Sequence, residues 1–365
     1  MSNNCILIAA GGTGGHIYPA LAIAHAMRKH RPDCQIYFVG TAHGLENKIV
    51  PKAGFPVLHI SIGRLNRNVR LKERISTVFK MPFAFLQCIW LILSRRPKLV
   101  LGVGGHSSGP LLLMAALLRR RTAIWEPNAM PGMANRILSR FVNEVYVVFE
   151  ESKKHLHSKK FISAGMPVRA EIENVKTLHK PNPEKFHLFS FGGSQGSRGV
   201  NTAVTEMMVG GGLWTQSVEL VQQTGPSELK RNQDLYGLQL SLLPVELKDY
   251  IHDMDQKYAW ADLVIARSGT GTLSELAACG KPAILIPLPT AADNHQQKNA
   301  EEFVKMGAAI MILQKDLNGV VLREQIKSLQ ADLPRVKSMG ERARSFHQPG
   351  AADKIAQHLL EGAGI

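Results

Sequence analysis

The chain has 365 residues, of which 45% are hydrophobic, and its formal net charge is +15. This length predicts two domains that can each bury a full core, and this composition is typical of a soluble globular protein. The four cysteines lie far apart and form no CxxC pair, which indicates reduced, mostly buried thiols in a cytosolic protein and argues against a metal site.

We expect neither a signal peptide nor a membrane span. The first apolar run, Cys5–Ala10, is too short for the hydrophobic region of a signal peptide and is better interpreted as a strand. The longest run, Met81–Leu93, is interrupted by Gln87 and is shorter than the roughly 20 residues that a membrane-spanning helix needs.

The positive charge is concentrated in one half of the chain. Residues 1–170 hold 24 Lys and Arg against 7 Asp and Glu, whereas residues 171–365 hold 20 against 22. Such asymmetry indicates that the N-terminal half faces something anionic, which is a nucleic acid, a membrane surface or a phosphorylated substrate.

Short apolar runs alternate with helical patterns along the first half, which predicts a parallel sheet covered by helices on both faces. The expected strands are Cys5–Ala10, Gln35–Val39, Leu99–Val103, Ala123–Trp125 and Val145–Phe149, and the expected helices are Tyr18–Lys29 and Pro110–Arg120. The polar stretch Glu171–Lys185 is typical of a linker. The pattern then restarts, with strands at Phe186–Phe191, Asp262–Ala266 and Ala283–Ile286. The sequence therefore predicts two doubly wound α/β domains facing each other across a cleft.

Four junctions between a strand and a helix are rich in glycine or hydroxyl residues: Gly11–His16, Gly104–Pro110, Gly192–Gly199 and Ser268–Ser274. Glycine lets a ligand approach the backbone, and the helix that follows offers unpaired N–H groups to an anion. Two such junctions in each half favour an anionic ligand over simple tight turns. The first loop lacks the third glycine and the acidic residue of a dinucleotide fingerprint, and no loop contains the G-K-[ST] of a Walker A motif.

The stretch "RSGTGTLSE" places several hydroxyls at a helix start and Glu275 in the first turns of that helix. A carboxylate at a nucleotide site commonly accepts hydrogen bonds from ribose hydroxyls, although Glu275 fits a helix-capping role as well. Gln296 and Gln297 are predicted on a loop, where paired amides can contact sugar hydroxyls or simply face solvent.

These motifs, taken in order, resemble those of the MurG family of N-acetylglucosaminyltransferases over nearly the whole chain. The matching stretches are "GGTGGH", "VLGVGGHSSGP", "WEPNAMPGMANR", "GMPVR", "GGSQGSRGVN", "YIHDM" and "YAWADLVIARSGTGTLSELAACGKPAILIP". The resemblance implies a GT-B fold, with two Rossmann-like domains and a UDP-sugar in the cleft. It implies an acceptor- and membrane-binding domain at 1–169, a UDP-sugar-binding domain at 170–345 and a C-terminal segment, 346–365, whose helix Ala351–Leu360 packs back on the first domain.

The implied reaction is an inverting transfer of N-acetylglucosamine from UDP to the C4 hydroxyl of a lipid-linked muramoyl pentapeptide in peptidoglycan synthesis. UDP-N-acetylglucosamine is then a substrate, and no tightly bound cofactor or metal is expected. The residues that the resemblance places at the donor are Thr13, Gly14, Gly15, His16, Asn128, Arg169, Ser194, Ile251, Thr270, Gly271, Thr272, Leu273, Ser274, Glu275, Gln296 and Gln297.

The chain departs from the family pattern at three places. Trp125 and Pro127 stand where the family has His and Gln, which leaves Glu126 and Asn128 of that motif in place. His106 stands where a tyrosine is expected, and "TAADNHQQ" replaces a more basic loop.

His16 is the best candidate for the catalytic base, because an imidazole with a pKa of about 6.5 can exchange protons near neutrality. The alternative is that His16 orients the loop or binds a substrate oxygen, and Glu126 is the second candidate base. Asp253 and Asp255 imitate a D-x-D metal motif, but their context predicts a helix N-cap and first turn. Mg²⁺ can still associate with the free substrates.

A basic segment with aromatic residues, predicted as a helix pair, is the candidate membrane surface on the cytoplasmic face of the inner membrane. Its residues include Ile75, Phe79, Phe83, Trp90, Arg95 and Arg96. A core helix with a solvated basic rim would show the same pattern. Other cell-wall synthesis proteins are further candidate partners.

Three other functions remain as alternatives. Another UDP-sugar enzyme, such as a UDP-N-acetylglucosamine 2-epimerase, would share the fold. A nucleic-acid-binding protein would explain the charge, but the chain has none of the usual nucleic-acid-binding motifs. The missing acid and glycine argue against a nicotinamide-dependent oxidoreductase.

Overall fold

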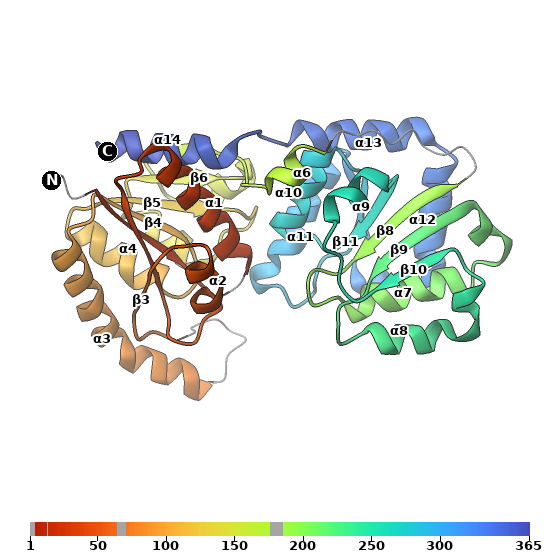
Figure 1. The fold of residues 1–365 in the computed structure, drawn as a ribbon, viewed down its shortest axis with the longest axis horizontal. Helices are drawn as coiled ribbons and strands as arrows, with labels where there is room; N and C mark the ends of the chain where they lie inside the picture. Colours follow the sequence, from red (N-terminus) through yellow and green to blue (C-terminus); the bar gives the residue numbers. More distant parts are fainter. Residues whose placement is uncertain (1–3, 13, 64–70, 176–184) are drawn as a thin grey trace. The chain divides into compact units, whose positions relative to one another are not determined.

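The computed structural model describes residues 4–12, 14–63, 71–175 and 185–365, and for residues 71–76 and 78 it describes the backbone only. The chain forms two units, Met1–Pro167 together with Gly350–Ile365, and Val168–Pro349 (Figure 1). The sequence-based boundaries lie at 169 and 345, so Arg169 belongs to the second unit rather than to the first.

The first unit is built on a parallel sheet of seven strands in the order β3-β2-β1-β4-β5-β6-β7. The strands are β1 (Cys5–Ala10), β2 (Gln35–Gly40), β3 (Val57–His59), β4 (Leu99–Gly104), β5 (Arg121–Glu126), β6 (Glu144–Val147) and β7 (Phe161–Ser163). The helices are α1 (Gly14–His30), α2 (Glu46–Lys52), α3 (Leu71–Arg95), α4 (Ser108–Leu117), α5 (Met133–Leu138) and α14 (Ala351–Gly362), with a 3₁₀ turn η1 (Glu150–His155). Every residue of β1 is buried, as expected of a central strand with helices on both faces.

The C-terminal helix α14 packs against α1 in the first unit (Figure 1). Asp353 Oδ1 lies 3.4 Å from Lys29 Nζ and 3.1 Å from His30 Nε2. Further along, His358 Nδ1 lies 2.5 Å from the hydroxyl of Tyr146. The last sixteen residues therefore complete the unit that the first 167 residues begin.

The second unit contains a parallel sheet of six strands in the order β10-β9-β8-β11-β12-β13. The strands are β8 (Phe186–Phe191), β9 (Val218–Gln223), β10 (Val245–Lys248), β11 (Leu263–Ala266), β12 (Ala283–Leu285) and β13 (Ala309–Met311). The helices are α6 (Ala170–Glu173), α7 (Arg198–Val209), α8 (Leu229–Tyr236), α9 (Met254–Trp260), α10 (Thr270–Cys279), α11 (His295–Lys305), α12 (Gly319–Gln330) and α13 (Leu333–Ser345). Short 3₁₀ turns are η2 (Gly212–Ser217), η3 (Gly237–Ser241), η4 (Ala292–Asn294) and η5 (Gln314–Asp316).

The sequence analysis missed β3, β7, β9, β10 and β13. Four of these, β3, β7, β10 and β13, are edge strands, which are short and only half-buried. In β9, Gln222 and Gln223 look too polar for a core strand, but Tyr236 donates to Gln222 and the Gln223 amide bonds to Gly193 and Ile251. A buried polar side chain is tolerated once its hydrogen bonds are made.

Two further expectations need correction. Helix α1 begins at Gly14, not Tyr18. Glycine has a low helix propensity, so the pattern predicted a later start, but tertiary context overrides propensity in this first turn. Part of the predicted linker is helical, since α6 covers Ala170–Glu173, while 176–184 lie outside the described residues.

Candidate active site

In each unit the glycine-rich loops follow the two strands at which the strand order reverses. These strands are β1 and β4 in the first unit, and β8 and β11 in the second. In open parallel sheets the crevice at the carboxyl ends of such neighbouring strands is where ligands bind. All four loops found in the sequence therefore lie at the two positions where this fold offers a ligand site.

In the first unit the two glycine-rich loops contact each other. The N–H of Gly11 donates to the carbonyl of Gly104 at 3.3 Å. A Cβ on Gly105, which has a φ of +90°, would lie 2.5 Å from the Gly11 oxygen, and a Cβ on Gly104 would lie 2.6 Å from the ring of His16. Glycine at 104 and 105 thus allows the loops to close around the imidazole.

His16 lies in the first turn of α1 and is partly buried. Its Nδ1 is 3.2 Å from the carbonyl oxygen of Gly11. Because a carbonyl oxygen only accepts hydrogen bonds, this contact requires a proton on Nδ1, and in the neutral ring Nε2 then carries the lone pair. Gly14 and Gly15 belong to the same turn, and Thr13 lies outside the described residues.

Glu126 ends β5 and is 1% exposed. Its Oε1 accepts hydrogen bonds from the backbone and side-chain nitrogens of Asn128 at 2.9 and 3.2 Å. Its Oε2 accepts from the Gly132 N–H and from Asn135 Nδ2 at 3.1 and 2.8 Å. Burial raises the pKa of the carboxyl group, and these donors oppose that shift. With both oxygens engaged, Glu126 is better placed to shape the loop that carries Asn128 than to act as a base.

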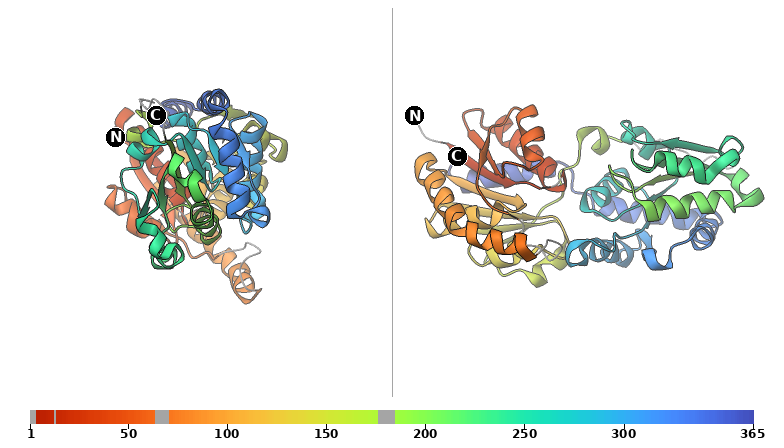
Figure 2. Two further views of the ribbon diagram at one scale, coloured as in Figure 1. Left: turned by 90° about the vertical axis from the view of Figure 1, so that its right-hand side faces the viewer. Right: turned by 90° about the horizontal axis from the view of Figure 1, so that it is seen from below.

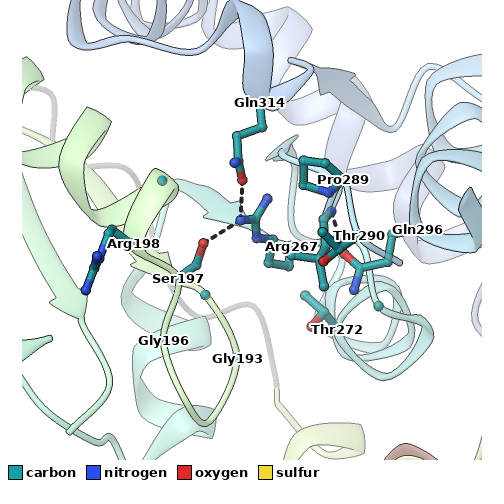
Figure 3. Close-up of a pocket in the computed structure, with 14 residues that line it drawn as sticks. Gly193, Gly196, Ser197, Arg198, Arg267, Thr272, Pro289, Thr290, Gln296 and Gln314 are labelled. Carbon is teal, nitrogen blue, oxygen red and sulfur yellow. Dashed lines mark hydrogen bonds between the residues drawn. The ribbon is translucent and has the colours of Figure 1, made fainter. Parts of the chain in front are cut away.

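The second unit contains a pocket of about 520 Å³ between the loops that follow β8, β11 and β12 (Figure 3). The lining residues are Gly192, Gly193, Gly196, Ser197, Arg198, Gly199, Arg267, Gly269, Thr272, Leu288, Pro289, Thr290, Gln296 and Gln314. Arg198 turns away and binds Glu228 at 2.8 Å, whereas Arg267 extends between Ser197 and Gln314.

Arg267 is 8% exposed. Its Nη1 donates to the carbonyls of Ile286 and Pro287 at 3.0 and 2.9 Å. Its Nη2 donates at 2.6 Å to both Ser197 Oγ and Gln314 Oε1. Burial lowers the pKa of the guanidinium to about 10, so the group remains charged at neutral pH. All four acceptors are uncharged, and the N-terminus of α10 follows Gly269 in the same pocket, so the site favours an anion.

Arg169 and Glu275 are joined beside α10. Arg169 Nη2 lies 3.3 Å from Glu275 Oε1, and the Tyr258 hydroxyl donates to Glu275 Oε2 at 2.9 Å. Burial raises the pKa of Glu275, although Arg169 and Tyr258 oppose the shift. The carboxylate is therefore held in one orientation, with 21% of its side chain exposed.

The other expected donor residues are distributed around this region. Thr272 and Gln296 line the pocket, and the Thr270 hydroxyl accepts from Asn299. Both glutamines lie in the first turn of α11 rather than on a loop, and Gln297 donates to Glu301. Ser194 lies in an exposed turn, and Gly271 is exposed at the start of α10. The remaining expected residues, Ile251, Leu273 and Ser274, are buried. Leu273 has an exposed fraction of 0%, so neither its side chain nor its backbone offers accessible surface to a ligand.

Residues 6–147 match the N-terminal domain of glycosyltransferase family 28, and residues 187–355 match its C-terminal domain. The chain belongs to glycosyltransferase family 28. A Bdellovibrio bacteriovorus relative, described as a "UDP-N-acetylglucosamine--N-acetylmuramyl-(pentapeptide) pyrophosphoryl-undecaprenol N-acetylglucosamine transferase", is 46% identical over 98% of each chain. A Myxococcus xanthus relative with the same description is 38% identical over 98% of this chain and 92% of its own.

Solved structures of the family and of its fold agree with this assignment. The crystal structure of Acinetobacter baumannii MurG matches with a TM-score of 0.81 and 27% identity, over 98% of this chain and 99% of that chain. A UDP-GlcNAc 2-epimerase from Neisseria meningitidis matches with a TM-score of 0.67 at 14% identity, over 98% and 100% of the two chains, and shares the fold alone. The predicted GT-B architecture of two parallel-sheet α/β domains is confirmed.

The departures from the family pattern have different structural consequences. Trp125 is fully buried in β5, so its side chain belongs to the core. His106 lies beside the first loop, with Nε2 3.9 Å from the position that a Cβ on Gly12 would take. Asp253 takes the N-cap position of α9, as predicted, but the described residues show no capping hydrogen bond from its side chain.

Helix α3 has two different faces. Ala84, Cys88, Leu91 and Ile92 are at most 4% exposed, and the helix packs against α4. The opposite face carries an apolar stripe, at least 53% exposed, that consists of Phe79, Phe83, Leu86, Trp90 and Leu93. The predicted helix pair is one continuous helix from Leu71 to Arg95, and its N-terminal end extends beyond the sheet (Figure 2).

Basic residues accompany this stripe. Arg96 is exposed, whereas Arg95 is partly buried and donates to the Tyr37 hydroxyl at 2.8 Å. The side chain of Ile75 lies outside the described residues. No helix in the described part of the chain is both long and apolar enough to cross a bilayer.

Sequence reasoning did not nominate four residues that the structure brings to these sites. Arg267, Ser197 and Gln314 meet in the pocket, and Glu46 contacts the first glycine-rich loop. The one available signal was an arginine directly after a buried strand in "VIARSG", because a charged residue there has to find partners at the end of the sheet.

Proposed function

We propose that the protein transfers N-acetylglucosamine from UDP-N-acetylglucosamine to the C4 hydroxyl of a muramoyl-pentapeptide that a diphosphate joins to a polyprenyl lipid. The 46% identity to the Bdellovibrio transferase over 98% of each chain carries this proposal. The product is the second lipid-linked precursor of peptidoglycan, so the reaction serves cell-wall synthesis and, through it, cell shape and division.

The second unit binds the donor in this proposal. The pocket around Arg267 suits the diphosphate, because a buried guanidinium and a helix N-terminus favour negative charge there. Glu275 is oriented by Tyr258 and Arg169. In this proposal Glu275 accepts hydrogen bonds from the ribose, and Arg169 supplies positive charge to the phosphates. No tightly bound cofactor is part of the proposal, since these groups supply the positive charge that the leaving group needs.

The first unit binds the acceptor, and His16 is the base. Nε2 accepts the proton of the C4 hydroxyl as its oxygen attacks the anomeric carbon of the donor sugar. The bond from that carbon to the UDP oxygen breaks in the same step, so one displacement converts the α-linked donor into a β-linked product. UDP leaves with the bonding electrons, and the proton stays on His16. Glu126 holds the loop that brings Asn128 to the sugar.

The apolar stripe of α3 is the proposed membrane contact, on the cytoplasmic face of the inner membrane. Its five side chains recur at spacings of four and three residues, so they lie along one side of the helix. An exposed apolar stripe beside basic residues suits an anionic lipid surface, each basic residue near that surface contributing about 1 kcal/mol. Other cell-wall synthesis proteins are proposed as further partners at the same membrane.

The deciding experiment incubates the purified protein with radiolabelled UDP-N-acetylglucosamine and a lipid-linked muramoyl-pentapeptide. We expect the label to enter the lipid fraction only when the acceptor is present. Release of a labelled UDP-sugar epimer without acceptor would instead indicate a 2-epimerase. Absence of acceptor-dependent label in a folded protein that binds UDP would refute the proposed transfer.

A further inference from the structure

Glu46, in the first turn of α2, is a buried carboxylate with no role in the mechanism so far. It is 1% exposed. Its Oε1 accepts hydrogen bonds from the N–H and the hydroxyl of Thr41 at 2.8 and 3.3 Å. Its Oε2 accepts from the N–H of Gly12 at 3.1 Å. The carboxylate therefore joins the end of β2 to the first glycine-rich loop.

The backbone around this carboxylate is shaped to receive it. A Cβ on Gly11, Gly40 or Gly44 would lie within 3.1 Å of carboxylate atoms of Glu46. Any larger residue at these positions would displace the carboxylate or the segment that carries the substitution. Two chain segments, the first glycine-rich loop and the connection from β2 to α2, thus leave room for one acidic group.

The N–H of Gly12 and the carbonyl of Gly11 belong to the same peptide group. In a trans peptide these two groups point in opposite directions, and the described chain contains no cis peptide bonds. Glu46 holds the N–H side of this peptide at 3.1 Å, and His16 Nδ1 meets the carbonyl side at 3.2 Å. A carboxylate, a peptide and an imidazole are thereby linked in one chain of hydrogen bonds.

We propose that Glu46 is a positioning residue that fixes the ring orientation and tautomer of His16 through the peptide group between Gly11 and Gly12. A carboxylate on the N–H polarises the peptide and makes its carbonyl a better acceptor, since hydrogen bonds in a chain strengthen one another. The Gly11 carbonyl then retains the proton of Nδ1, which leaves the lone pair on Nε2. The inference rests on the proposed function in one respect, namely that Nε2 accepts the acceptor's proton.

The alternative role for Glu46 is to stabilise the start of α2 and the loop, as an acid in a first helical turn commonly does. That role predicts loss of stability on substitution without a change in the tautomer of His16 or in the pH profile. The two roles therefore differ in measurable ways.

The central variant is Glu46→Gln, which removes the charge and replaces one accepting oxygen by a donor. We expect kcat to fall at least about tenfold, because a positioned general base contributes roughly 10²- to 10⁴-fold and the wrong tautomer forfeits much of this. The donor KM should stay within about twofold. In the dependence of kcat on pH, the acid limb should move to lower pH, because the imidazolium of His16 loses a stabilising negative charge.

Three matched controls separate this effect from general disruption. Thr41→Ala removes one contact to Oε1 but keeps the Gly12 contact, so turnover should stay within about twofold. Glu144→Gln perturbs another fully buried carboxylate of the first unit, bound by Arg121 and Lys160, and should lower stability without moving the acid limb. His106 is another titratable side chain beside this loop, so His106→Gln tests whether it contributes to the acid limb.

The tautomer is read directly by long-range ¹H–¹⁵N correlation spectra of histidine-labelled protein, with His16→Asn to assign the signal. We expect the neutral ring to carry its proton on Nδ1 in the unsubstituted protein, and to lose this preference in Glu46→Gln. A proton on Nε2 in the unsubstituted protein overturns the inference, even if Glu46→Gln does not fold. An unchanged tautomer, kcat and acid limb in folded Glu46→Gln overturn it as well.

The failure of the proposed function looks different. If His16→Ala turns over nearly normally, His16 is not the base, whatever the tautomer is. If His16→Ala is inactive while Glu46→Gln is normal, the base assignment is not contradicted and only the positioning role of Glu46 is wrong.

Discussion

Replacement of Arg267 by methionine tests whether the pocket of the second unit is built for the diphosphate. Methionine is a flexible, unbranched side chain without charge, so it fills much of the same space. The guanidinium donates its four Nη hydrogens to Ile286, Pro287, Ser197 and Gln314, so Arg267 acts on a ligand mainly through its charge. The substitution therefore removes one buried positive charge from the pocket.

The size of the effect follows from Coulomb's law. At an effective dielectric constant of about 20, unit charges about 5 Å apart interact by about 3 kcal/mol. Screening by water in the open pocket reduces this value, and we expect the affinity for UDP to fall by about 2–3 kcal/mol, or roughly 30- to 150-fold. Uridine has no phosphate, so its affinity should change less than about twofold.

Calorimetric titration with UDP and with uridine measures both quantities, and thermal unfolding shows whether the variant is folded. The salt dependence of UDP binding should also weaken, because one charge of the pair is gone. An equal loss of UDP and uridine affinity would show that the substitution disrupts the pocket generally. Unchanged UDP affinity in folded Arg267→Met would refute the assignment of this pocket to the diphosphate.

Further substitutions test the remaining assignments. His16→Ala should lower kcat by roughly 10²- to 10⁴-fold with little change in UDP affinity, and near-normal turnover would contradict its role as base. In Glu126, a pKa raised by burial means that the folded chain binds its proton more tightly than the unfolded chain. The contribution of Glu126 to stability therefore declines as pH rises from about 4.3 toward the raised pKa. Over that range, the free energy of unfolding of Glu126→Gln should rise relative to that of the unsubstituted protein, which thermal or denaturant unfolding at several pH values measures. Binding to vesicles should rise with anionic lipid and fall with salt. Phe79→Ser and Trp90→Ser should weaken vesicle binding, whereas the control Leu238→Ser, at a 93% exposed position of the second unit, should not. Equal loss of binding in all three variants would contradict the role of the α3 stripe as the membrane contact.

The parts of the fold that depend on local pattern were predictable. Among the central strands, Cys5–Ala10 is a continuous apolar run and Phe186–Phe191 is apolar at four of its six positions, and the structure has both with the same bounds. Edge strands such as Val57–His59 are only half-buried, so they carry little hydrophobic signal. The strand Val218–Gln223 was missed because partners distant in sequence satisfy its glutamines.

The same division applies to helix α3. Its sequence shows aromatic and basic residues together, and both a membrane face and a core face fit that pattern. The structure shows which residues take which face, since Cys88 and Ile92 are buried while Phe79 and Trp90 are exposed. Helical periodicity shows which residues share a face, but only packing against α4 decides which face is buried.

The sequence by itself determined where each glycine-rich loop begins and that His16 stands at a helix start, because strand ends, glycines and helix starts are local features of the chain. Only the tertiary structure brought Arg267 to Ser197 and Gln314, and Glu46 to Gly12, since these partners are 34 to 70 residues apart. Strand order creates such contacts, and a buried charge is tolerated only where the folded chain delivers donors or acceptors to it. The loops could therefore be located from the sequence. Only the fold showed that Arg267 supplies positive charge at one loop and that Glu46 binds another.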